Sequence, residues 1–91
     1  MFETAKTSNG GAYMAENLSN LKNVEYHASS QAEIYIAELE LPDLTLNITY
    51  NCTNGNLFIH EWYQLDDAEY DSIRKPLLKY FENLYENRRA S

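Results

Sequence analysis

Residues 44–63, LTLNITYNCTNGNLFIHEWY, hold the pattern that decides the fold of this chain. Apolar and polar side chains alternate over residues 44–52, as expected of a β-strand with one buried face. The pair Asn54–Gly55 follows, and it is the strongest short signal for a type I′ hairpin turn, in which both central residues need a positive φ. The sequence therefore predicts a hairpin whose second strand runs over 56–63.

Two further strands are expected on the N-terminal side of this hairpin. Residues 33–41 form the nearer one, because Pro42 and Asp43 then provide a tight turn in which proline presets φ. Residues 24–28 alternate apolar with polar side chains and predict a short edge strand. Apolar residues recur at helical spacing over 13–22, which predicts a short amphipathic helix before the first strand.

The hydrophobic period changes after the hairpin, where a long helix is expected. Asp66 is placed to cap its free amide groups, and Glu69 stands at the reciprocal position of a capping box. Apolar residues then mark one stripe along a helix that reaches about Arg88. Pro76 lies inside this helix and removes a backbone hydrogen bond, so a kink, or a break near residues 74–75, is predicted.

In order, these elements predict an α+β two-layer sandwich: a short N-terminal helix, an antiparallel meander of three or four strands, and a C-terminal helix packed on one face. The chain has 91 residues, so we expect one domain over 13–91 after a flexible N-terminal arm, 1–12. The order resembles that of double-stranded-RNA-binding domains. However, Asp66, Asp67 and Glu69 occupy the helix start where such a domain needs lysines, which predicts repulsion of phosphates.

Two-residue turns would fix the register of the hairpins, so the composition of each sheet face can be predicted. One face is almost wholly apolar, and its expected pairs across the second hairpin are Cys52 with Leu57, Tyr50 with Ile59, Ile48 with Glu61 and Leu46 with Tyr63. The C-terminal helix is expected to pack on this face through Ile73, Leu77, Phe81 and Leu84.

The opposite face combines amides and hydroxyls with side chains that are too apolar to be left in water without reason. Its expected rows are Glu38, Asn47, Trp62; then Ile36, Thr49, His60; then Ile34, Asn51, Phe58, with Glu40 beside Thr45. Three occupants could cover it: the N-terminal helix, a second copy of the chain, or a partner protein that uses Trp62 as an aromatic anchor.

Charge is segregated along the chain, and this segregation carries the functional prediction. Fourteen acidic and seven basic residues give a net charge of −7, and residues 23–73 contain ten acids but no lysine or arginine. This balance argues against direct binding to nucleic acid or to an anionic membrane. It favours a basic protein as the partner.

The sequence thus predicts a small acidic binding module that occupies a basic surface of a partner, such as a nucleic-acid-binding enzyme or a toxin, and inhibits it. In size and charge alone it is similar to phage antidefence and immunity proteins. The expected partner-binding residues are Glu38, Glu40, Asp43, Asn47, Phe58, His60, Trp62, Asp66, Asp67 and Glu69. The alternative is a homodimeric structural or chaperone-like protein with the mixed face as its interface.

No catalytic residue, metal or cofactor is predicted. Cys52 and His60 would form the obvious catalytic dyad, but the alternation of the strands puts them on opposite faces. One cysteine and two separated histidines give no closely spaced set of metal ligands. A single cysteine suits a reducing cytoplasm, and residues 1–11 lack the apolar run of a signal peptide, so a cytoplasmic location is expected.

Overall fold

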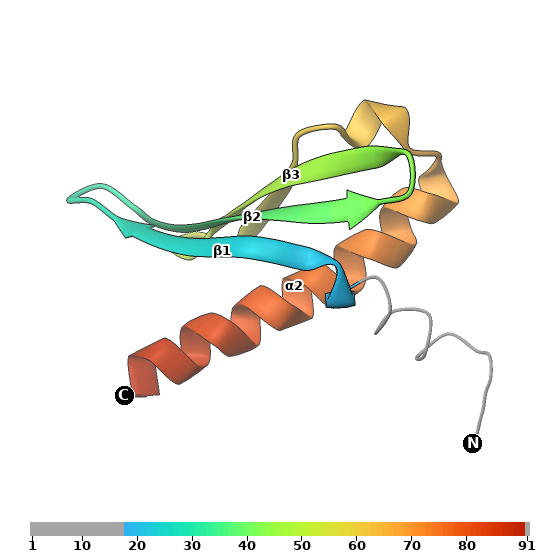
Figure 1. Cartoon of the computed structure of the whole chain (residues 1–91). Coiled ribbons are helices and arrows are strands. Elements are labelled where there is room, and N and C mark those ends of the chain that lie inside the picture. The colour runs from blue at the N-terminus through green and yellow to red at the C-terminus, as the bar shows by residue number, and fades with distance from the viewer. Residues whose placement is uncertain (1–17, 91) are drawn as a thin grey trace, which may run out of the picture.

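Four strands follow one another along the chain and pair in the same order, so the sheet is an antiparallel meander (Figure 1). The computed structural model describes residues 18–90. The elements are β1 (Leu21–Ala28), β2 (Glu33–Leu41), β3 (Leu44–Asn51), β4 (Asn56–Ile59), a 3₁₀ turn η1 (Trp62–Gln64) and helix α2 (Asp67–Ala90).

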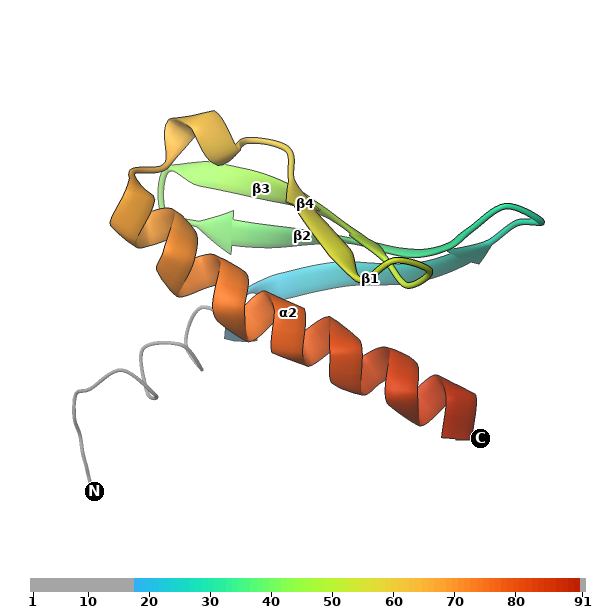
Figure 2. The same cartoon turned by 180° about the vertical axis from the view of Figure 1, so that it is seen from behind.

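Helix α2 lies across one face of the sheet in both views of the molecule (Figures 1 and 2). The core forms between the two layers and consists of Tyr35, Ala37, Leu39, Leu46, Ile48, Tyr50, Ile59, Ile73, Leu77 and Phe81. Burial of each large apolar side chain contributes about 1.5–3 kcal/mol. The α+β arrangement and the face covered by the C-terminal helix are therefore as predicted, and Leu57 and Leu84 pack against this core at its margin.

The register between β3 and β4 differs from the predicted one by two residues. The observed pairs are Ile48 with Ile59, Thr49 with Phe58, Tyr50 with Leu57 and Asn51 with Asn56. The hairpin loop thus has four residues, 52–55, and the predicted two-residue turn is wrong. Because the shift is an even number of residues, the strand residues of β3 and β4 keep their predicted faces.

Asparagine side chains account for this wider turn. The Oδ1 atom of Asn51 accepts hydrogen bonds from the backbone N–H groups of Thr53 and Asn54, at 2.8 and 3.3 Å. The backbone N–H of Gly55 donates to the carbonyl of Asn51 at 2.8 Å, and Gly55 has a φ of 77°. Asn54 is not in the left-handed region, so the type I′ geometry is not adopted.

Strand β4 ends at Ile59, four residues before the predicted end. The Glu61 carboxylate turns back to β3 and accepts hydrogen bonds from the backbone N–H and the side-chain amide of Asn47, at 2.6 and 2.7 Å. The Glu61 carboxylate thus accepts the backbone N–H of Asn47, which would need a carbonyl of β4 as its acceptor if that strand continued. Glu61 and Tyr63 are consequently not on the core face, and Trp62 begins the turn η1 instead of lying on the sheet.

Strand β1 begins earlier than predicted and is irregular. Of the predicted helix over 13–22, Leu21 and Lys22 belong to β1, where they pair with Leu39 and Glu38. Of the other residues of that helix, Leu18 and Ser19 are helical and Asn20 forms a turn, whereas residues 13–17 and the predicted arm lie outside the described residues. A β-bulge falls between Lys22 and Glu25, and Asn23 has a φ of 56°, a conformation that asparagine tolerates better than most residues.

Helix α2 begins as predicted and continues beyond Pro76. Asp66 Oδ1 accepts from the backbone N–H of Glu69 at 2.8 Å, and Glu69 Oε1 accepts from that of Asp66 at 3.0 Å, which is a capping box. Pro76 lies within one continuous helix, so the predicted break is wrong. Ile73 and Leu77 are buried on both sides of the proline, and this packing holds the two halves in one helix.

Candidate protein-binding surface

The sheet face opposite α2 is not covered by any element of the described chain, and we call it the open face. Its side chains form rows across the four strands in the observed register. The rows are His27, Ile34, Asn51, Asn56; then Glu25, Ile36, Thr49, Phe58; then Lys22, Glu38, Asn47, His60; and finally Glu40 with Thr45. Carboxylates thus gather at β1 and β2, while amides and hydroxyls lie along β3.

A hollow of about 260 Å³ lies in the open face, and we call it the acidic hollow. It is lined by the side chains of Asn23, Glu25, Ile36, Glu38, Asn47, Thr49 and His60. The side-chain amide of Asn23 donates to Glu38 at 3.0 Å, and Thr49 Oγ1 is hydrogen-bonded to His60 Nε2 at 2.9 Å. The bulge at Asn23 is therefore part of this site, because it brings the amide to the carboxylate on β2.

Two carboxylates of the open face have a lysine or histidine side chain close by among the described residues, and His27 Nε2 lies 3.1 Å from Glu25 Oε1. Lys22 Nζ lies 2.8 Å from Glu40, and both side chains are about half exposed. The hydrogen bond to Glu40 raises the pKa of Lys22. Lys22 stands one residue before the base-free segment 23–73, and the early start of β1 places it on the open face. The sheet therefore carries a lysine, although the strands predicted from the sequence contain no lysine or arginine.

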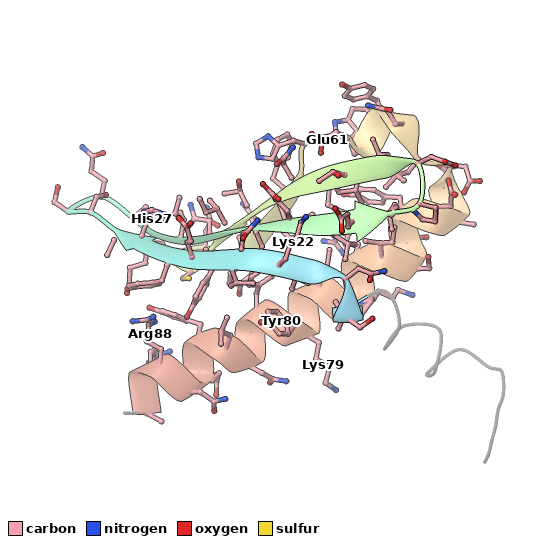
Figure 3. The ribbon with its side chains drawn as sticks, viewed as in Figure 1. Lys22, His27, Glu61, Lys79, Tyr80 and Arg88 are labelled. Atoms are coloured by element: carbon pink, nitrogen blue, oxygen red, sulfur yellow. The ribbon has the colours of Figure 1, made fainter. Side chains whose placement is uncertain are left out.

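The other basic residues of the described chain, Arg74, Lys75, Lys79, Arg88 and Arg89, all lie on α2. Arg88 stacks over the ring of Tyr26 at 3.7 Å and donates through Nε to the Tyr35 hydroxyl at 3.1 Å. Figure 3 shows Arg88 and Lys79 on the α2 side of the sheet, away from Glu61. The basic end of the chain therefore engages aromatic rings on the covered side of the sheet.

Glu33, at the start of β2, lies against the C-terminal part of α2. Its carboxylate accepts hydrogen bonds from the hydroxyls of Tyr26 and Tyr85. These bonds lower the pKa of Glu33, and the bond to Glu33 raises the pKa of Tyr26 to about 12. With the stacked Arg88, this Glu33 cluster ties β1, β2 and α2 together, so Glu33 is a structural acid.

Glu61 is held in a similar way at the other end of the sheet. Desolvation raises the pKa of its carboxyl, but the hydrogen bonds from the Asn47 backbone and amide outweigh it, so the pKa is lowered overall. Glu61 therefore stays ionised while fixing the end of β4.

Three aromatic side chains of the described chain are strongly exposed, and they meet at one place. Phe58, Trp62 and Tyr63 retain 50, 53 and 67% of their accessible surface. They line a second hollow of about 490 Å³, here called the aromatic hollow, together with Ile59, Leu65, Asp67 and Tyr70. The Phe58 ring contacts His60 at 4.6 Å between centroids, so this hollow borders the open face.

The predicted partner-binding residues accordingly divide into separate groups. Glu38, Asn47 and His60 line the acidic hollow, with Phe58 beside them and Glu40 farther along β2. Asp43 lies in the β2–β3 turn, while Asp66 and Glu69 form the helix cap. Trp62 and Asp67 belong to the aromatic hollow, so the predicted row of Glu38, Asn47 and Trp62 does not exist, and His60 takes the place of the tryptophan.

Sequence reasoning missed Asn23 and Glu25 in the acidic hollow and Tyr63 and Tyr70 in the aromatic one. A bulge has no reliable signature in an alternating strand, and the assumed two-residue turn assigned Tyr63 to the core face. The cluster of Phe58, Trp62 and Tyr63 within six residues was the available signal for an exposed aromatic site.

The chemistry of the remaining groups and the comparisons add no further site. Burial raises the pKa of the Cys52 thiol, which packs at the margin of the core, whereas His60 lies on the open face. Residues 18–90 contain no group of three or more ligands for a metal ion. No helix among them is long and apolar enough to cross a membrane. Comparison with protein-family models, curated proteins and solved structures found no match to this chain.

Proposed function

We propose that this chain is a small acidic protein-binding module whose open face occupies a basic surface of a partner protein and inhibits it. The observation that carries the proposal is the acidic surplus of the open face. Glu25, Glu38 and Glu40 lie there with one lysine, Lys22, whereas α2 on the other side of the sheet carries five acids and five bases. A cationic partner would therefore be attracted to the open face more strongly than to α2.

The open face also offers the contacts that a bound partner needs. Ile34, Ile36 and Phe58 supply apolar area, and the carboxylates steer a basic surface toward it and set its orientation. Glu38 and Glu40 lie about 6.8 Å apart along β2, a spacing that can imitate phosphates along a nucleic-acid strand. A nucleic-acid-binding surface of an enzyme or a toxin is therefore the favoured target.

Competition for such a target provides the test. The chain would be immobilised, a cell lysate applied at about 50 mM salt and eluted at about 500 mM, and the eluted protein purified, since screening weakens exposed charge contacts. The purified partner is then mixed with its nucleic acid and with increasing amounts of the chain. We expect the chain to displace the nucleic acid.

A matched pair of variants distinguishes the open face from net charge alone. Glu38→Lys with Glu40→Lys changes the charge of the open face, and Glu82→Lys with Glu86→Lys makes the same change on the exposed side of α2. The first variant should lose displacement and the second should retain it. Equal loss in both variants would contradict a role for the open face.

A second copy of the chain is the alternative occupant of this face. Light scattering at micromolar concentration should give the mass of one chain. A mass twice as large that returns to that of one chain in a Phe58→Asp variant would overturn the proposal in favour of a homodimer interface.

A further inference from the structure

The aromatic hollow is a different surface from the open face and has its own chemistry. Its most exposed walls are Trp62 and Tyr63, whose rings stand at 87° to each other with centroids 6.1 Å apart. Tyr70 from the first turns of α2 and Phe58 from β4 complete it. The two rings contact each other edge to face and together expose a large aromatic surface, and so large an exposed aromatic cluster indicates a site of contact.

The polar atoms of these rings indicate what fits there. Three of the lining residues, Trp62, Tyr63 and Tyr70, carry an indole N–H or a hydroxyl that is able to donate a hydrogen bond. A polyproline II segment is complementary to such a surface, since its backbone carbonyls are not used internally and its rings are rigid and apolar. Aromatic-lined grooves recognise proline-rich segments for this reason.

Charge selects the kind of segment. Asp67 is the one charged residue that lines the aromatic hollow, and the helix cap is made by Asp66 and Glu69, so Asp67 is not needed for it. The described lining contains no basic side chain that would balance this carboxylate. An arginine next to the prolines would therefore lie beside Asp67, with aromatic faces close enough for cation–π contact.

We propose that the aromatic hollow binds a proline-rich segment of a partner protein that carries an arginine next to its prolines. The proline rings pack on the exposed surfaces of Trp62 and Tyr63, and the guanidinium group pairs with Asp67. This inference does not depend on the proposed role of the open face, because the two surfaces meet only where Phe58 contacts His60.

Trp62 is the single tryptophan of the chain, so its fluorescence reports on the hollow directly. The full chain would be titrated with a synthetic peptide of about ten residues that alternates prolines with leucines and ends in arginine. We expect a saturable blue shift of the emission. The same peptide with glutamate in place of the arginine should bind about threefold to fivefold more weakly. A peptide with every proline replaced by alanine should give no saturable change.

Variants then assign the contacts. Tyr63→Ala should weaken binding of the arginine peptide about tenfold, as for an aromatic anchor. Asp67→Asn should remove the difference between the arginine and glutamate peptides, while Asp71→Asn, in the same helix but outside the lining, should keep it. Glu38→Lys with Glu40→Lys should leave peptide binding unchanged, which separates this proposal from that for the open face. Circular dichroism would confirm that each variant is folded.

Three results would overturn the proposal. One is the absence of a saturable response to the arginine peptide at millimolar concentration. Another is equal binding of the alanine peptide, which would assign the hollow to apolar helices in general. The third is an emission shift that depends on the concentration of the chain itself without peptide, which would assign the hollow to a second copy.

Discussion

The two faces of the sheet arise from the same alternating strands, yet one forms the core and the other stays open. Phe81 meets the covered face from α2 and has no exposed surface, whereas Phe58 stands on the opposite face of β4 and keeps half of its surface. Residues of one type thus lie in opposite environments. The comparison shows that alternation assigns residues to faces, and that the more apolar of the two faces is the one on which α2 packs to form the core.

The largest expected effect on the free energy of unfolding comes from replacing one of the two phenylalanines in this comparison. Phe81→Ala leaves a cavity among buried side chains and should lower the free energy of unfolding by about 3–5 kcal/mol. Phe58→Ala removes an exposed ring and should change it by no more than about 0.5 kcal/mol. Urea unfolding of both variants measures the difference. Similar losses would show that the open face is covered in the native protein.

The next effect concerns the start of the helix that creates the covered face. Asp66→Ala removes the side chain that accepts from the backbone N–H of Glu69, and it should cost about 1 kcal/mol of stability. Asp71→Ala lies beyond the cap and should cost less. Equal losses would show that the capping box contributes nothing beyond its charge.

The Glu33 cluster predicts how stability on the covered side depends on pH. The folded state lowers the pKa of Glu33 below its ordinary value of 4.5 through hydrogen bonds from Tyr26 and Tyr85. The resulting stabilisation is therefore present above about pH 4.5 and is lost as the pH falls through the lowered pKa. In a Glu33→Gln variant, the urea midpoint should fall less steeply below pH 4.5. An unchanged slope would contradict this account.

At alkaline pH, the Tyr26 hydroxyl makes stability fall as the pH rises. The hydrogen bond to Glu33 raises the pKa of Tyr26 from 10.0 to about 12. Between these values the unfolded chain loses the Tyr26 proton first, so stability is complete below pH 10 and falls as the pH rises through 12. Tyr26→Phe should make the urea midpoint less dependent on pH in this range.

The smallest expected effect on stability belongs to the open face. Glu38→Lys with Glu40→Lys changes two side chains outside the core and should shift the free energy of unfolding by about 0.5 kcal/mol. The same variant should abolish binding of a basic partner, so the face would be shown to serve binding more than folding. Marked unfolding of this variant would show that the open-face carboxylates have a structural role.

Much of the fold could be predicted because its signals are local. Alternation identified β3, Pro42 and Asp43 located the turn that joins it to β2, and the capping box located the start of α2. The register of β4 could not be predicted, since it depends on bonds between Asn51 and its own loop and between Glu61 and Asn47. Those contacts involve short polar side chains, whose choice of partner is set by the folded geometry.

The candidate site was predicted in part for the same reason. Side-chain parity placed Glu38, Asn47 and His60 on one face, and the observed even shift of register preserved that face. The predicted place of Trp62 was wrong because no turn or breaker residue marks the end of β4 at Ile59. The early start of β1 places Lys22 beside Glu40, and the distribution of charge along the chain did not predict this ion pair.

The amino-acid sequence by itself determined which side chains share a face and that a capped amphipathic helix would cover the apolar one. These properties follow from the two-residue period of a strand and the 3.6-residue period of a helix, which each segment carries within itself. The tertiary structure decided the register of β4, the place of Trp62 and the charges that meet on the open face. Those depend on contacts between segments distant in the chain, and their geometry exists only after the layers have packed.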